Sequence, residues 1–150
     1  MGKGISLTYI DSSCLVKVFR PEPESSAVLK ALTSESTVIV SELTELEVMV
    51  QLKADFLAGD LTRPRWRQLE ARVSLLRHEP PYEFRVLSAA VFRTALRQHR
   101  NSGDVHCRSL DRLHLAAMEE LSVSRLMTHD ERQAKAAAEA GFEVVKPGRD

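Results

Sequence analysis

Short runs rich in β-branched residues recur along this 150-residue chain, and a segment with helical spacing of apolar residues separates each run from the next. The runs predict strands at residues 5–10, 37–40, 83–87, 125–128 and 142–145. Strands joined through helices need crossover connections, which place helices on both faces of a sheet. The sequence therefore predicts a single α/β domain over residues 1–150, a three-layer sandwich around a mainly parallel sheet of four to five strands.

The composition is typical of a soluble globular protein. Hydrophobic residues make up 43% and charged residues 28% of the chain, which excludes a disordered protein. The longest apolar runs have four residues, whereas a membrane span needs about 18. The apolar start at 5–10 is interrupted by Asp11 before it reaches signal-peptide length, so we expect a cytoplasmic protein without a membrane segment. Cys14 and Cys107 are too far apart for a metal-binding pair and are expected to be buried, reduced thiols.

Charge is unevenly distributed along the chain. The 21 basic and 21 acidic residues cancel overall, but residues 61–112 contain eleven arginines, no lysine and five acidic residues, a net charge of +6. Two interpretations remain open: a solvated helical surface, or a surface that binds phosphates or an acidic partner. On the second interpretation, the candidate RNA-binding or partner-binding residues are Arg65, Arg72 and Arg97.

Carboxylates follow two of the predicted strands. Asp11 ends the first strand and Asp130 follows the fourth, and the carboxyl ends of parallel strands meet at one edge of a sheet, where ligands bind. Asp111 lies in the first turn of a helix predicted from Ser109, whose apolar residues cover almost its whole circumference. Each aspartate has a structural alternative, because an aspartate at a helix start often serves as a cap. For the first helix, Ser12 and Ser13 are also candidate N-caps.

A fourth carboxylate is predicted from helical phase in the segment that follows Ser41. At about 100° per residue, the expected buried stripe consists of Leu43, Leu46, Val50 and Ala54. Glu47 falls inside this stripe, whereas Glu42 and Glu45 fall outside it. A carboxylate on a buried face needs a partner, a proton or a bound cation, so Glu47 is preferred over its neighbours.

Four acids form a candidate site: Asp11, Glu47, Asp111 and Asp130. The sequence shows no buried lysine that would neutralise each of them. All-oxygen ligands favour Mg²⁺ or Mn²⁺, whereas zinc would need histidine or cysteine. The nearby His114 and His129 are expected to be packing or surface residues. A carboxylate-held divalent cation suits phosphodiester hydrolysis, and the chain has no phosphate-binding loop of the kind that nucleoside triphosphates require.

Four segments resemble the successive motifs of PIN domains, most closely those of VapC-type ribonuclease toxins: residues 9–19, 40–52, 108–118 and 127–145. The resemblance implies that the four acids are the catalytic and metal-binding residues of the family, and that Ser13 and Thr128 are its polar helpers near the metal. It also implies a PIN-like fold, dependence on Mg²⁺ or Mn²⁺, cleavage of single-stranded or loop RNA, homodimerisation and inhibition by a small antitoxin in a type II toxin–antitoxin pair.

Other classes fit the residues less well. A response-regulator receiver needs adjacent acids after its first strand, and here two serines follow Asp11. A haloacid-dehalogenase-like phosphatase needs an aspartate where Ser13 stands. The remaining alternative is a non-catalytic PIN-like module that binds RNA or protein.

Overall fold

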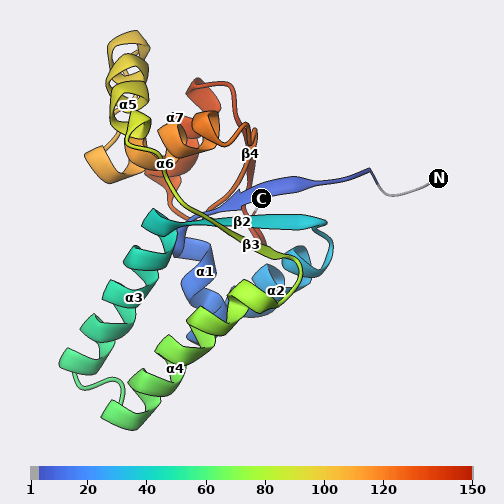
Figure 1. Ribbon diagram of the computed structural model, residues 1–150, viewed down its shortest axis with the longest axis vertical. Coiled ribbons are helices and arrows are strands. Elements are labelled where there is room, and N and C mark those ends of the chain that lie inside the picture. Colours follow the sequence, from blue (N-terminus) through green and yellow to red (C-terminus); the bar gives the residue numbers. More distant parts are fainter. Residues whose placement is uncertain (1–3, 150) are drawn as a thin grey trace.

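The computed structural model describes residues 4–149 and is built on a parallel sheet of five strands (Figure 1). The strand order is β3-β2-β1-β4-β5. The strands span Leu7–Ile10 (β1), Thr37–Ser41 (β2), Tyr82–Arg85 (β3), Arg125–Met127 (β4) and Glu143–Val145 (β5). Every pairing is parallel, which confirms the predicted fold class.

The central strand β1 explains why the N-terminal run is so apolar. It pairs with β2 on one side and β4 on the other, and Tyr9 and Ile10 are fully buried. Successive side chains of a strand point to opposite faces. Accordingly, Ile10 packs into the hydrophobic core on one face of the sheet and Tyr9 into the core on the other. Burial on both faces is what a parallel sheet between helical layers requires.

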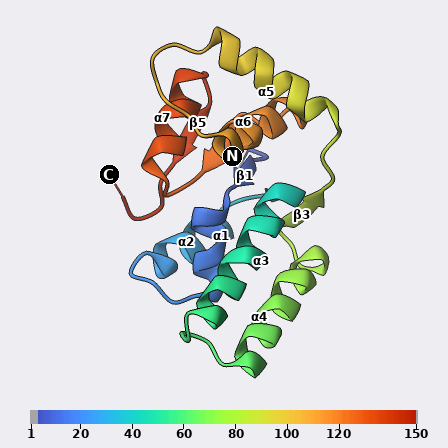
Figure 2. The same ribbon diagram turned by 90° about the vertical axis from the view of Figure 1, so that its left-hand side faces the viewer.

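Seven α-helices cover the sheet. They span Ser12–Phe19 (α1), Ser25–Thr33 (α2), Glu42–Leu57 (α3), Arg63–Leu75 (α4), Ala90–Asn101 (α5), Ser109–Glu120 (α6) and Glu131–Glu139 (α7), with a short 3-10 helix at Leu76–His78. Helices α1–α4 lie together on one side and α5–α7 on the other, and α4 and α5 are at opposite ends of the molecule (Figures 1 and 2). None of the helices in the described part of the chain is long and apolar enough to cross a membrane.

The predicted burial of α3 is wrong. Its buried residues are Thr44, Val48 and Leu52, whereas Leu46 is 60% and Val50 59% exposed. The helix carries apolar residues on two faces, and the spacing of its apolar residues favours the face that lacks Thr44. Packing against α1 and α4 selects the other face, and Thr44 can be buried there because its hydroxyl donates to the carbonyl oxygen of Ile10 at 2.9 Å.

The two cysteines also differ from expectation in one respect. Both are free thiols, and Cys14 in α1 is fully buried in the core as predicted. Cys107 is only half-buried, in the loop before α6, so its predicted burial is wrong. Loops that connect elements remain partly open to solvent, and nothing in the local sequence distinguishes this cysteine from a core residue.

The burial of α3 yields a matched pair of substitutions. Leu52→Ala is expected to lower the free energy of unfolding by about 2–5 kcal/mol, because it empties a fully buried position. Leu46→Ala, on the exposed face of the same helix, is expected to change it by no more than about 0.5 kcal/mol. Urea denaturation measures both. A larger loss for Leu46→Ala than for Leu52→Ala would show that the helix packs on the face that carries Leu46.

Candidate active site

Asp11 follows the end of β1, and hydrogen-bond donors from the start of α1 and the end of β4 surround its carboxylate. Its carboxylate accepts from the Ser13 hydroxyl at 2.6 Å, from the backbone N–H of Cys14 at 3.3 Å, and from the Thr128 hydroxyl. Asp11 is therefore the N-cap of α1, in place of the predicted Ser12 or Ser13. Ser13 instead directs its hydroxyl at the carboxylate while accepting from the backbone N–H of His129 at 2.8 Å.

Burial dominates the electrostatics of Asp11. The residue is only 4% exposed, and loss of hydration raises the pKa of its carboxyl above the ordinary value. The hydrogen bonds from Ser13 and Thr128 act in the opposite direction without cancelling the effect of burial. An ionised Asp11 is thus costly for the protein and has a strong demand for positive charge nearby.

Asp130 lies beside Asp11 and is linked to it through one hydroxyl. The Thr128 hydroxyl donates a hydrogen bond to the Asp11 carboxylate, and the oxygen of this hydroxyl accepts one from the backbone N–H of Asp130 at 3.0 Å. The Asp130 carboxylate caps α7 by accepting from the backbone N–H of Gln133 at 3.0 Å. The capping interpretation therefore holds for both strand-end aspartates.

Asp111 is joined to Asp130 by a cation that the sequence pattern did not single out. The residue is 7% exposed in the first turn of α6. The Arg108 guanidinium contacts Asp111 through Nε at 2.9 Å and Asp130 through a terminal nitrogen at 3.0 Å. The hydrogen bond to Asp111 is the main cause that raises the pKa of Arg108. Gln133 also donates its side-chain amide to the backbone carbonyl of Asp111 at 3.2 Å.

Glu47 is held by a buried histidine. Its carboxylate meets Nε2 of His114, whose Nδ1 lies 2.6 Å from the Tyr9 hydroxyl. The Tyr9 hydroxyl in turn lies 2.6 Å from the Ser41 hydroxyl. Donation from His114 Nε2 to Glu47 and from the Tyr9 hydroxyl to His114 Nδ1 satisfies this whole chain. His114 is therefore a buried packing residue, as expected, that also orients a candidate ligand.

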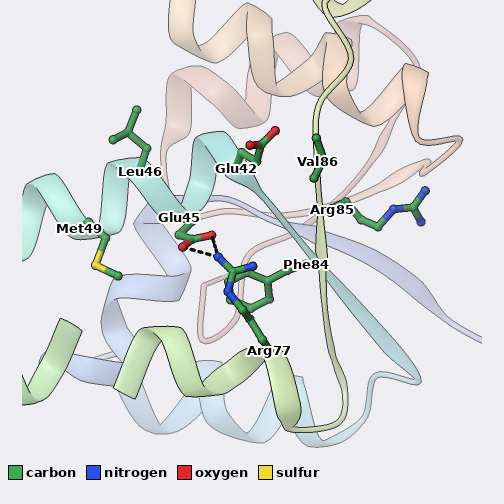
Figure 3. Close-up of a pocket in the computed structure, with 8 residues that line it drawn as sticks. All are labelled: Glu42, Glu45, Leu46, Met49, Arg77, Phe84, Arg85 and Val86. Atoms are coloured by element: carbon green, nitrogen blue, oxygen red, sulfur yellow. Dashed lines mark hydrogen bonds and ion pairs between the residues drawn. The ribbon is translucent and has the colours of Figure 1, made fainter. Parts of the chain in front are cut away.

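Glu45 faces a different surface from Glu47. It pairs with Arg77 at 2.6 Å, and this guanidinium lies over the ring of Phe84 at 4.4 Å (Figure 3). The groove drawn in Figure 3 is lined by residues of α3 and of the segment around β3, and it contains neither Asp11 nor Glu47. Glu42 lines the same groove and accepts from the backbone N–H of Leu87 at 2.6 Å. The preference for Glu47 as the site residue remains a prediction, although the helical phase used for it was wrong.

The four carboxylates are each occupied by partners of the chain itself. In residues 4–149, no three acidic, histidine or cysteine side chains are arranged so that they could hold a metal ion. The donor set nevertheless suits a hard cation, because it consists of carboxylate and hydroxyl oxygens. Arg108 shows that a positive charge fits between Asp111 and Asp130.

The candidate arginines do not form one surface. Arg65 and Arg72 lie on α4 and Arg97 on α5, at opposite ends of the molecule (Figure 2). Arg97 pairs with Glu119, and Arg72 lies over the ring of Phe19 at 5.6 Å. The +6 segment is therefore divided by the fold, although the contribution of each arginine to binding stays a prediction.

The sequence matches a known family across most of its length. The profile of the PIN domain family matches residues 8–139. The chain is 33% identical over 141 residues to Ribonuclease VapC46 of Mycobacterium tuberculosis, and the match covers 93% of this chain and 96% of that protein. The chain therefore belongs to the PIN domain family, and the resemblance carried by the four segments is confirmed.

Solved structures show the same fold. The Mycobacterium tuberculosis toxin VapC20, described as cleaving the sarcin–ricin loop, superposes with a TM-score of 0.70 at 14% identity, covering 93% of this chain and 99% of that one. VapBC2 from Rickettsia felis, bound to a DNA fragment from its promoter, gives a TM-score of 0.63 at 12% identity, with 93% and 97% covered. At such identities the similarity establishes the architecture, and the PIN-like three-layer arrangement is confirmed.

Two members of the site were missed in the sequence. Arg108 stands three residues before Asp111, close enough in the chain to suggest an ion pair, although it precedes the first residue of α6. For His114 the sequence carries no comparable signal, because its partners Tyr9 and Glu47 are far away in the chain.

The burial of Asp11 leads to a prediction about stability without metal. Asp11→Asn is expected to raise the melting temperature in chelator by roughly 2–4 °C, the shift for about 1 kcal/mol in a domain of this size, because it removes a desolvated charge. The raised pKa destabilises the fold above the folded-state pKa, so the advantage of the variant shrinks as pH falls towards the ordinary value of 3.8. Thermal melts over a pH series measure this, and a variant less stable than wild type at neutral pH would contradict it.

Proposed function

We propose that this chain is a metal-dependent endoribonuclease that hydrolyses RNA phosphodiester bonds, and that it is the toxin of a type II toxin–antitoxin pair. The observation that carries the proposal is the convergence of Asp11, Asp111 and Asp130 at one edge of the sheet, where Thr128 links two of them and Arg108 links two. Membership of the PIN domain family and the relative named as a ribonuclease support the activity.

The residues that would hold Mg²⁺ or Mn²⁺ are Asp11, Glu47, Asp111 and Asp130. A divalent cation bound there supplies positive charge opposite phosphate oxygens and makes water more acidic. Support for this ligand set comes from its all-oxygen chemistry and from the cost of leaving the buried Asp11 carboxylate without positive charge.

The neighbouring side chains position these acids. The hydroxyls of Ser13 and Thr128 each donate to a different oxygen of Asp11, which fixes the plane of its carboxylate. His114 fixes Glu47 in the same way, and its own orientation is set by Tyr9. Such preorganisation means that the acids do not have to be ordered when RNA arrives.

RNA and an antitoxin are the proposed partners. VapC20 is described as a toxin that cleaves the sarcin–ricin loop, and VapBC2 is described as bound to a DNA fragment from its promoter. By likeness to toxins of the PIN domain family, we infer a single-stranded or loop RNA substrate, a cognate antitoxin, a homodimeric state and a cytoplasmic location. Arg65, Arg72 and Arg97 stay the predicted contacts for RNA or antitoxin.

The activity is tested by digestion of total RNA in Mg²⁺ or Mn²⁺. Wild type is expected to cut, whereas Asp11→Asn and Glu47→Gln are expected to lose at least about 100-fold in rate, since each removes one anionic ligand. Glu45→Gln is the matched control on the same helix and is expected to keep nearly full activity, because Glu45 pairs with Arg77 elsewhere. Cleavage by Asp11→Asn at the wild-type rate would remove Asp11 from the site, and an absence of cleavage by the wild type would favour the alternative, a non-catalytic PIN-like module.

The partner is tested by co-expression with any small protein that the neighbouring gene encodes. The two proteins are expected to co-elute in size-exclusion chromatography, and the complex is expected to cut RNA more slowly than the free toxin. The free toxin run alone gives its oligomeric state in the same experiment. Separate elution, with cleavage unaffected by the second protein, would rule that protein out as the antitoxin.

A further inference from the structure

Arg108 bridges two of the candidate metal-binding acids. Its Nε donates to one Asp111 oxygen at 2.9 Å, and a terminal nitrogen donates to Asp130 at 3.0 Å and reaches the other Asp111 oxygen at 3.4 Å. Hydrogen bonds between a guanidinium and a carboxylate are strong because both groups are charged. In the metal-free protein, this one side chain neutralises part of the charge that a divalent cation would neutralise.

The carboxylates and the arginine differ in how firmly they are held. Asp130 is fixed by its cap on α7, and Asp111 lies in α6 with its carbonyl held by Gln133. The Arg108 side chain is 54% exposed, so it can swing into solvent without crossing packed protein. The Asp130 carboxylate and the backbone of Asp111 therefore stay in place when the guanidinium leaves.

We propose that Arg108 is a built-in counter-ion that competes with the divalent cation for Asp111 and Asp130, and that on release it binds a phosphate of the RNA. A carboxylate oxygen directed at a guanidinium proton is not free to coordinate a metal, so the two cations exclude one another. The inference rests on the proposed function, since it assumes a metal and an RNA substrate at this site.

The second half of the proposal follows from the position of the freed group. A guanidinium displaced from the two carboxylates remains at the solvent-facing side of the acids, where an RNA backbone must approach them. Its planar fork matches phosphate oxygens as well as it matches a carboxylate. The Arg108 guanidinium thus exchanges the two carboxylates for a phosphate of the substrate when the divalent cation binds.

This exchange predicts opposite effects of one substitution on two ligands. In Arg108→Gln, the apparent dissociation constant for Mn²⁺ is expected to fall about three- to tenfold, because the competitor is removed. Binding of single-stranded RNA is expected to weaken about two- to fivefold, and the slope of its logarithmic salt dependence to become less steep by about 1. A residue that merely supports the fold would weaken both.

The test uses the full chain in calorimetric titrations with Mn²⁺ and in fluorescence anisotropy with a labelled single-stranded RNA in Ca²⁺, with RNA integrity checked on gels. Arg108→Lys keeps the charge but loses the fork, so its Mn²⁺ affinity is expected to lie between those of wild type and Arg108→Gln. Arg93→Gln removes an exposed arginine from α5 and is the control for charge alone. Melts in chelator check that each variant is folded.

The results separate this inference from the proposed function. An Arg108→Gln protein that binds Mn²⁺ no more tightly than wild type, or no more tightly than Arg93→Gln, overturns the competition, even if Asp11→Asn has lost RNA cleavage. The competition is also overturned if Arg108→Lys binds Mn²⁺ as weakly as wild type, or if neither wild type nor Arg108→Gln binds it. Tighter Mn²⁺ binding with unchanged RNA affinity overturns the transfer to phosphate.

Discussion

The buried carboxylate of Asp11 is the constraint on which the site depends. It lies at the end of the central strand, where water is excluded, and its charge must be balanced by groups that the fold brings to it. Thr128 comes from the end of β4, 117 residues away, and Ser13 comes from the helix that Asp11 itself caps. One carboxylate thereby ties together the first helix and two adjacent strands.

The negative charges of the remaining acids are balanced by different partners. Glu47 uses His114, and Asp111 and Asp130 share Arg108. The imidazole of His114 orients Glu47 through a hydrogen bond, as the hydroxyls of Ser13 and Thr128 orient Asp11. Arg108 differs, because it carries a full charge and is exposed, and this difference makes it the element of the site best suited to exchange with a metal.

Helix α3 shows how one element serves two surfaces. Thr44 and Val48 pack inwards, Glu47 turns towards α6, and Glu45 turns towards Arg77 in the groove of Figure 3. A helix that carries apolar residues on several faces has no single phase that the sequence can reveal. The buried stripe that favours Glu47 over Glu45 in the sequence is contradicted by the exposure of Leu46 and Val50. The contact of Glu47 with His114 is therefore the better support for Glu47 as a site residue.

Local patterns are enough to predict the α/β class, the parallel sheet and the strand-end positions of Asp11 and Asp130, because β-branched runs and turn signals act over a few residues. Long-range packing settles which face of α3 is buried, that Asp11 and not a serine caps α1, and that the arginines of the basic segment are separated. It also supplied His114 and Arg108 with their partners. These features depend on contacts between segments distant in the chain, whose energies no local pattern contains.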